Sequence, residues 1–308
     1  MTAAAEIHFQ GVRGQLRQNE PMARYVSWRA GGPARRFFAP VDLVDLSNFI
    51  GQLPPEEPIL FVGLGSNLLV RDGGWPGTVI LTHGAAKRPR FEEGRLYAEA
   101  GVACPKLSRF AAMSKLGGAE FLTGIPGTVG GALAMNAGCY GGETWDIVEN
   151  VVTINRHGQL RWRAKADFEI EYRHCELKSD VSTGEDEWFA AAYFKLPEGD
   201  TEESRAIMQS LLEKRRKSQP LQLPNAGSVF RNPEEGKPAA RLIQFSGLKN
   251  LEHNGARVSD KHANFIVNPK GAAKASDIEW LIDRIRTVVR EETGVQLETE
   301  VRIVGDAA

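Results

Sequence analysis

The chain has 308 residues, with 38 Lys and Arg against 39 Asp and Glu, so its formal net charge is −1. This balance and the lack of a basic stripe argue against a nucleic-acid-binding protein and are compatible with a monomer. Hydrophobic residues make up 42% of the chain. No apolar run approaches the ~18 residues that a membrane helix needs, so the composition predicts a globular protein with two or three domain cores and no membrane span.

The first third of the chain predicts a short α/β unit. Residues 1–20 show no regular pattern and are expected to form an irregular arm. Apolar residues at helical spacing predict a helix over residues 41–52, and the apolar runs at 59–62 and 79–81 predict buried strands. A glycine-rich loop at residues 63–70 (GLGSNLLV) follows the first of these strands, where ligand-binding loops tend to lie in α/β folds.

The middle of the chain predicts one helix and a group of strands. Residues 105–116 form a helix with Pro105 at its first position and glycines beyond its end. A second glycine-rich segment, GIPGTVGGALAMNAG, occupies residues 124–138. The turn His157-Gly158 is expected to close a hairpin. The predicted strands are residues 96–100, 148–155, 160–162 and 188–196.

The last third predicts two long helices and a final strand. Thr201 is expected to cap a helix that ends before Pro220, and the pattern Ser276-x-x-Glu279 is typical of a capping box that opens the second helix. Residues 297–304 are expected to form a strand, on which Glu298 and Glu300 would share one face. The resulting fold class is α+β with small mixed sheets.

Both glycine-rich segments are candidate anion sites. Glycine allows close approach to the backbone, and successive backbone N–H groups form concave sites for phosphate. A single loop of this kind is more often a tight turn. Neither loop has the Gly-Lys-Ser/Thr of a P-loop or the G-x-G-x-x-G spacing of a Rossmann turn. Two such loops together indicate a ligand with an extended anionic middle, such as a dinucleotide.

The wording of these loops resembles the flavin-binding loops of UDP-N-acetylenolpyruvoylglucosamine reductases, in the vanillyl-alcohol-oxidase-like flavoprotein superfamily. Further motifs that resemble this family occur in the same order from Ser27 to Gly305. They are SWRAGGPA at residues 27–34, YRHC at 172–175, NAGSVFRNP at 225–233, GARVSDKHANFIVN at 255–268 and LETEVRIVG at 297–305.

The resemblance implies a two-part FAD-binding domain followed by an α+β substrate-binding domain. The expected divisions are 1–20 for the arm, 21–85 and 86–198 for the two FAD-binding subdomains, and 199–308 for the substrate-binding domain. It also implies non-covalent FAD, with Asn67 and Asn136 as polar anchors and the hydroxyls of Ser66 and Thr128 as phosphate donors. The full set of residues expected at FAD is Gly63, Leu64, Gly65, Ser66, Asn67, Leu68, Gly124, Ile125, Pro126, Gly127, Thr128, Gly130, Gly131, Asn136, Ala137 and Gly138.

Three residues are candidates for catalysis through the same resemblance. Taken alone, Ser228 is most simply a turn residue, Glu300 a solvated carboxylate and Arg173 a surface cation. The resemblance implies that Arg173 faces the substrate carboxylate, which a guanidinium can bind through two parallel hydrogen bonds. It implies that Glu300 stabilises an enol or enolate, by hydrogen bonding or as a protonated acid. It also implies that Ser228 protonates C2 of the substrate, although a hydroxyl is a weak acid near neutral pH.

The implied reaction is the NADPH-dependent reduction of UDP-N-acetylglucosamine enolpyruvate to UDP-N-acetylmuramate, a peptidoglycan precursor. NADPH reduces the flavin, and flavin N5 then delivers hydride to C3 of the enolpyruvyl group. The chain is similar to the shorter type of this family, because residues 174–187 are acidic and contain no Tyr. This leaves the diphosphate ligand open between Lys249 and Arg257. The residues expected to bind substrate are Arg173, Asn225, Gly227, Lys261 and His262.

Two other functions stay open on the sequence: a flavin oxidase or dehydrogenase of the same superfamily, and a nucleotide-binding protein without turnover. Neither gives a reason for Arg173, Ser228 and Glu300 to stand in these motifs. The three cysteines have no C-x-x-C spacing, and the N-terminus lacks the pattern of a signal peptide, so a reducing, cytoplasmic location is expected. The six histidines show no metal-ligand spacing, and no metal site is expected.

Overall fold

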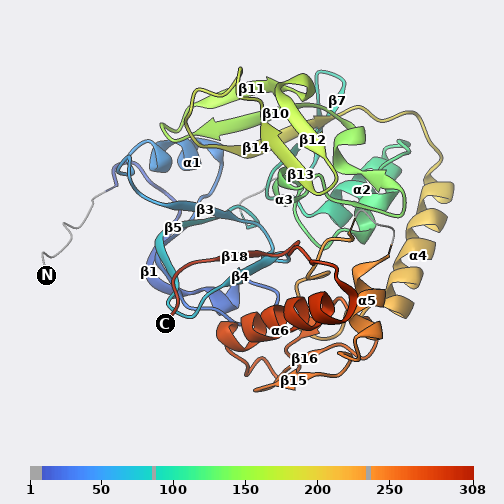
Figure 1. The fold of residues 1–308 in the computed structure, drawn as a ribbon. Helices are drawn as coiled ribbons and strands as arrows, with labels where there is room; N and C mark the ends of the chain where they lie inside the picture. The colour runs from blue at the N-terminus through green and yellow to red at the C-terminus, as the bar shows by residue number, and fades with distance from the viewer. Residues whose placement is uncertain (1–8, 85–87, 234–236) are drawn as a thin grey trace, which may run out of the picture.

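The computed structural model describes residues 9–84, 88–233 and 237–308. Figure 1 shows the sheet that contains β10 (Val148–Asn155), β11 (Leu160–Ala164) and β14 (Glu187–Phe194) at one end of the molecule. At the other end lies α6 (Ala275–Thr293) with β15 (Glu252–His253) and β16 (Ala256–Val258), and between the two ends lie β4 (Leu68–Val70) and β18 (Arg302–Val304). Helices and sheets alternate along the chain, so the predicted α+β class with small sheets is confirmed.

The first sheet has the order β1-β2-β5-β3, in which β1 is antiparallel to β2 and the other pairs are parallel. The expectation of an irregular arm is wrong for part of residues 1–20, because residues from Gln15 onward form the edge strand β1; residues 1–8 lie outside the described residues. The predicted helix over 41–52 and the strands at 59–62 and 79–81 are confirmed. Their bounds are β1 Gln15–Pro21, β2 Pro33–Ala39, α1 Leu43–Ile50, β3 Ile59–Val62 and β5 Trp75–Leu81.

The second sheet has the order β11-β10-β14-β7-β6 and is antiparallel throughout. A buried apolar cluster that includes Trp145 and Leu133 joins this sheet to α2 and α3. The predicted middle helix and four strands are confirmed. The bounds are β6 Arg90–Glu92, β7 Arg95–Glu99, α2 Cys104–Met113, α3 Val129–Ala134, β10 Val148–Asn155, β11 Leu160–Ala164 and β14 Glu187–Phe194.

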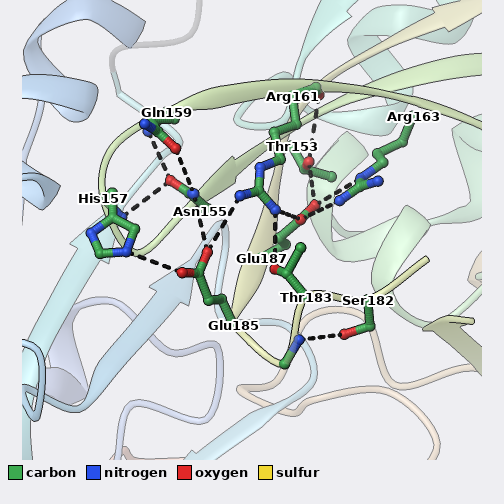
Figure 2. Close-up of polar contacts among 11 residues, drawn as sticks. Thr153, Asn155, His157, Gln159, Arg161, Arg163, Ser182, Thr183, Glu185 and Glu187 are labelled. Carbon is green, nitrogen blue, oxygen red and sulfur yellow. Dashed lines mark hydrogen bonds and ion pairs between the residues drawn. The ribbon is translucent and has the colours of Figure 1, made fainter. Parts of the chain in front are cut away.

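A polar network fixes the connection that enters β14. Figure 2 shows Arg161 and Arg163 meeting at the carboxylate of Glu187, which also accepts a 2.7 Å hydrogen bond from Thr153. Two residues earlier, Glu185 pairs with Arg161 at 3.4 Å. These contacts hold the short acidic connection against β10 and β11. The connection leaves the β12–β13 hairpin (Phe168–Glu171, His174–Leu177) at the end opposite its Tyr172-Arg173 turn.

The C-terminal part has a core of its own, packed against α6. Buried Trp28 joins this core to the first sheet region, because its Nε1 donates to the Ile266 carbonyl at 2.7 Å. Short elements complete the fold. The bounds are η1 Met22–Arg24, β4 Leu68–Val70, η2 Glu120–Gly124, β8 Gly138–Cys139, β9 Gly142–Glu143, η3 Thr144–Asp146, η4 Lys165–Asp167, α4 Thr201–Ser218, α5 Ala239–Phe245, β15 Glu252–His253, β16 Ala256–Val258, β17 Ile266–Val267, α6 Ala275–Thr293 and β18 Arg302–Val304.

Both predicted helix caps are wrong, although both helices exist. The N-cap of α4 is Asp200, whose carboxylate accepts from the N–H groups of Glu202 and Glu203, while Thr201 lies inside the helix. The N-cap of α6 is Lys274, so Ser276 lies in the first turn. Asp72 lies 203 residues before Ala275 in the sequence, and its carboxylate accepts from Ala275 N and Ser276 N at 2.9 and 3.0 Å. A distant carboxylate therefore caps α6.

The expected final strand is also shorter than predicted. Only Arg302–Val304 forms a strand, which pairs in parallel with β4. Before it, Thr299 makes an isolated bridge to Phe230, and the chain leaves the regular strand pattern. As a result Glu298 is exposed while Glu300 is largely buried, so the two carboxylates do not share one face.

Asp72→Asn should destabilise the protein. Burial tends to raise the pKa of Asp72, but hydrogen bonds from Ser276 and Ala275 hold that pKa below its ordinary value. The carboxylate therefore contributes stability above the ordinary pKa of 3.8, and this contribution disappears as pH falls through the lowered pKa. We expect a loss of about 1 kcal/mol at pH 7 in urea unfolding.

Asp283→Asn is the matched control, because Asp283 lies on the same helix with 66% of its side chain exposed. It should change the unfolding free energy by less than about 0.5 kcal/mol. An Asp72 variant as stable as wild type at pH 7 would show that this distant cap contributes nothing.

Candidate active site

The two glycine-rich loops lie against each other. A Cβ on Gly63 would stand 2.3 Å from the Thr128 Oγ1, and a Cβ on Gly127 would stand 3.6 Å from the Ser66 Oγ. The first contact is shorter than real Cβ contacts allow, so only glycine fits at position 63. Segments that are some sixty residues apart in the sequence therefore form one surface.

This surface carries backbone donors without protein acceptors. Among the described residues, the N–H groups of residues 64–67 in the first loop, and those of Gly127, Thr128 and Gly131 in the second, donate to no protein group. The Ser66 and Thr128 hydroxyls likewise have no hydrogen-bond partner within the described chain. Converging N–H and O–H donors form an anion-binding surface.

Gly65 fixes the shape of the first loop. Its φ is +59°, and a Cβ there would stand 2.2 Å from the Tyr25 carbonyl oxygen. Both the N–H and the hydroxyl of Ser27 donate to the Gly65 carbonyl, at 3.0 and 3.2 Å. The SWRAGGPA motif therefore supports the loop, and Leu68 continues it into β4 as a buried residue.

The other residues expected at FAD occupy several environments. Gly124 and Ile125 are buried, and a Cβ on Gly124 would meet Cys139; Pro126 is exposed. Gly130 and Ala137 also face protein, since Gly130 packs against Ala100 and Ala137 is buried.

The side chains of the two predicted polar anchors are engaged within the protein. Asn136 donates to Glu143 at 2.7 Å and to the Glu171 carbonyl at 3.2 Å, and it accepts from Trp145 N. Asn67 donates to the Glu300 carbonyl at 3.1 Å. Both asparagines thus connect the loops to the segments that carry Arg173 and Glu300.

The loop surface fits the diphosphate of FAD. The fit rests on N–H groups and hydroxyls of both loops that have no partner in the described part of the chain, at a place where a side chain on Gly63 would intrude. Residues 64–67, Gly127, Thr128 and Gly131 would hold the anionic part of the cofactor.

Arg173 and Glu300 meet at the edge of this surface. Arg173 Nε lies 3.1 Å from Glu300 Oε1, and its Nη2 donates to the Gly138 carbonyl at 2.9 Å. Only 16% and 14% of the two side chains is exposed. Arg173 occupies the tip of the β12–β13 hairpin with φ +57°. This backbone conformation is energetically unfavourable for any residue other than glycine.

Ser228 lies next to this pair through the backbone. Glu300 N donates to the carbonyl of Val229, the residue after Ser228, at 2.8 Å. Asn225 accepts from Gly227 N, and Gly227 has φ +77°, so these two residues form the turn that presents Ser228. Ser228 is half-buried, and its hydroxyl has no partner among the described residues. The fold therefore brings Arg173 and Glu300 into contact and places the segment that carries Ser228 beside Glu300.

Burial raises the pKa of Glu300 above the ordinary 4.5, while the positive charges of Arg173 and Arg231 oppose that rise. A carboxyl group with a raised pKa holds its proton to higher pH than usual. Burial therefore favours the protonated form of Glu300, whereas the two arginines favour its carboxylate.

Sequence reasoning missed Arg231. Its Nη2 donates to the Arg173 carbonyl at 3.2 Å, and its charge acts on Glu300. Arg231 lies three positions after Ser228 in the motif NAGSVFRNP. A cation so close to a proposed proton donor was the signal that could have identified it.

The remaining candidates lie on the C-terminal part of the site. Burial lowers the pKa of His262 and the charge of Lys249 acts in the same direction, so the imidazole is neutral near pH 7. Lys261 donates to the Arg216 carbonyl at the end of α4. Arg257 lies on β16, and its Nη1 is 3.6 Å from Glu252 Oε1. None of these has a recorded contact with Arg173 or Glu300 among the described residues.

Comparisons with known proteins match both halves of the chain. The model of the UDP-N-acetylenolpyruvoylglucosamine reductase C-terminal domain matches residues 219–304, and that of an FAD binding domain matches residues 36–163. A UDP-N-acetylenolpyruvoylglucosamine reductase of Nitrosospira multiformis is 53% identical over 321 residues, covering 98% of this chain and 92% of the relative. The chain belongs to the UDP-N-acetylenolpyruvoylglucosamine reductase family.

Two further members of this family support the assignment. The reductase of Alkalilimnicola ehrlichii is 53% identical, with 96% of each chain covered. The crystal structure of the Thermus caldophilus reductase matches with a TM-score of 0.77 at 33% identity, covering 94% of this chain and 98% of that one. The predicted fold class, the flavin oxidoreductase class and the FAD cofactor are confirmed by these matches. No helix among the described residues could span a membrane, and no group of metal-binding side chains gathers there.

Gly63→Ala should weaken FAD binding by roughly 10- to 100-fold, because overpacking costs about 1–3 kcal/mol. The clash is with the Thr128 side chain, so Gly63→Ala/Thr128→Ala should bind FAD nearly as well as Thr128→Ala alone. FAD dissociation constants by fluorescence titration test this, with Gly84→Ala as control because its Cβ would meet nothing within 4 Å. Equal affinity of Gly63→Ala and wild type would contradict the close contact.

Glu300→Gln should change how stability depends on pH. Because the pKa of Glu300 is raised by folding, wild-type stability falls as pH rises from 4.5 through the raised value. The stability of the variant lacks this dependence on pH. The free energy of unfolding of the variant, minus that of wild type, should therefore increase with pH over the same range and then level off. Urea unfolding across pH 4.5–8, at equal FAD content, measures the difference. A difference that is flat or falls with pH would refute the raised pKa.

Proposed function

We propose that this protein catalyses the NADPH-dependent reduction of UDP-N-acetylglucosamine enolpyruvate to UDP-N-acetylmuramate, a step of peptidoglycan precursor synthesis that serves cell-wall growth, cell shape and division. The observation that carries the proposal is the buried Arg173–Glu300 pair beside Ser228, at the edge of a flavin-binding surface. Bound FAD supplies the hydride transfer from NADPH to C3 of the enolpyruvyl group.

Arg173 binds the substrate carboxylate. Its Nε faces Glu300 and one Nη faces Gly138, so the rest of the fork remains for a second anion. Placed there, the guanidinium also stabilises the negative charge that develops when hydride reaches C3. The low exposure of the pair strengthens this interaction, because little water screens it.

Glu300 and Ser228 manage the proton. Glu300 stabilises the enolate, by hydrogen bonding or as a protonated acid, and burial favours its protonated form by raising its pKa. Ser228 delivers a proton to C2, since its hydroxyl has no partner among the described residues and the next residue, Val229, bonds Glu300 N. Asn225, Gly227, Lys261 and His262 contribute to the substrate site, with Lys249 or Arg257 at the diphosphate.

We propose a monomer that works in the cytoplasm, where its three free thiols would stay reduced. We also propose the division into FAD-binding parts over 21–85 and 86–198 and a substrate-binding part over 199–308. Hydrogen bonds cross the last boundary. Thr201 donates to the Ala112 carbonyl and Ser204 donates to the Glu120 carboxylate, so α4 contacts the preceding part.

The function is tested by anaerobic absorbance of the FAD-loaded protein. We expect the flavin bands to bleach with NADPH and to return when UDP-N-acetylglucosamine enolpyruvate is added. Bands that return only with oxygen would favour an oxidase and overturn the proposal. A protein that cannot be loaded with FAD would exclude the flavoenzyme assignment.

Ser228→Ala should separate the two halves of the reaction. Flavin bleaching by NADPH should stay within about threefold of wild type, whereas product formation should fall by roughly 10²- to 10⁴-fold, the usual worth of a positioned acid. Stopped-flow absorbance and product analysis measure the two rates. Near-normal product formation would show that another group donates the proton.

A further inference from the structure

Arg231 is a half-buried cation that none of the functional roles above uses. Its guanidinium has one protein acceptor among the described residues, the Arg173 carbonyl at 3.2 Å. Its Nε is buried and has no acceptor there. Most buried guanidinium groups pair with a carboxylate. This one makes no ion pair within the described chain, and it lies beside the Arg173–Glu300 pair.

The backbone fixes Arg231 in this position. Arg231 N donates to the Glu298 carbonyl at 2.9 Å, and the preceding residue, Phe230, is fully buried and bridges Thr299. Asn264 holds both backbone groups of Phe230 through its side-chain amide. The segment that carries Ser228 therefore also holds the backbone of Arg231 in place.

Arg231 bonds the carbonyl of a residue, Arg173, whose backbone is strained. Arg173 has φ +57°, at a hairpin tip where two residues connect β12 to β13. A non-glycine residue keeps such a conformation when its surroundings impose it. The hydrogen bond from Arg231 to the Arg173 carbonyl is one such restraint, and the bond from Asn136 to the neighbouring Glu171 carbonyl is another.

We propose that Arg231 is a positioning residue for the reduction: it holds the Arg173 turn through its carbonyl, and it places a second positive charge beside Glu300. The proposal rests on the proposed function for its kinetic consequences. With Arg231 in place, two cations and one carboxyl group stand where an anionic substrate binds. Without it, Arg173 would have to orient the substrate carboxylate and offset the charge of Glu300 alone.

The charge of Arg231 has a defined effect on titration. Among the described residues the charged groups that act on Glu300 are Arg173, from the β12–β13 turn, and Arg231, from the segment after Ser228. Both favour the carboxylate, against the effect of burial. Removing one of them raises the pKa of Glu300, so the limb of the pH–rate profile that belongs to Glu300 moves to higher pH.

The test compares Arg231→Gln and Arg231→Lys with wild type in the FAD-loaded full chain. Arg231→Gln should leave flavin reduction by NADPH within about twofold, slow flavin reoxidation by UDP-N-acetylglucosamine enolpyruvate about tenfold, and shift the pH limb upward. Arg231→Lys keeps the charge and should keep the wild-type limb with a smaller loss of rate. Arg241→Gln, an exposed arginine on α5, is the matched control and should behave as wild type.

A second readout needs no substrate. The pH dependence of unfolding is measured for wild type and Glu300→Gln, and again for the same two proteins carrying Arg231→Gln. The difference within each pair reports the pKa of Glu300 in that background. It should be higher with Arg231→Gln. If Arg231→Gln does not fold, Arg231→Met, which has similar length and needs no acceptor, replaces it.

An unchanged Glu300 pKa in the neutral variant, or an unchanged reoxidation rate, would overturn the proposal. A wild-type protein that is not reoxidised by the substrate would instead overturn the proposed function, and the unfolding readout would still decide the role of Arg231.

Discussion

The site depends on the buried contact between Arg173 and Glu300. The two residues are 127 positions apart, and each comes from a segment that regular secondary structure does not fix: a strained hairpin tip and an irregular stretch before a short strand. A buried ion pair is stable only when surrounding groups satisfy and orient both partners. Much of the nearby structure serves that need, since Gly138 binds the guanidinium, Asn67 binds the Glu300 carbonyl and Val229 binds the Glu300 N–H.

Related contacts join the glycine-rich loops to the segments that carry Arg173 and Glu300. Asn67 belongs to the first glycine-rich loop and donates to the Glu300 carbonyl, while Asn136 belongs to the second and donates to the Glu171 carbonyl, next to the tip of the Arg173 hairpin. Each asparagine therefore couples a glycine-rich loop, through a hydrogen bond, to the segment that carries Glu300 or Arg173. This coupling accounts for two asparagines that bond mainly within the protein, although they stand among residues that resemble a flavin site.

The sequence predicted what depends on local pattern. Residues 41–52, 148–155 and 188–196 form the expected elements because hydrophobic periodicity decides them. The failures involve tertiary contacts: β1 forms because β2 offers it an edge, and Asp72 caps α6 from 203 residues away. Arg173, Ser228 and Glu300 were reached through family motifs, and their proximity is a product of the fold. Arg231 lies three positions after Ser228, and this closeness was the one signal that could have pointed to it.

A double-mutant cycle on the Arg173–Glu300 pair tests this account most directly. The rate of flavin reoxidation by UDP-N-acetylglucosamine enolpyruvate would be measured for wild type, Arg173→Lys, Glu300→Gln and the double variant. If the pair acts as a unit, the double variant is little slower than the worse single variant, with a coupling energy above about 1 kcal/mol. Losses that add to within about 0.5 kcal/mol would show that the two residues act independently and would contradict the central claim.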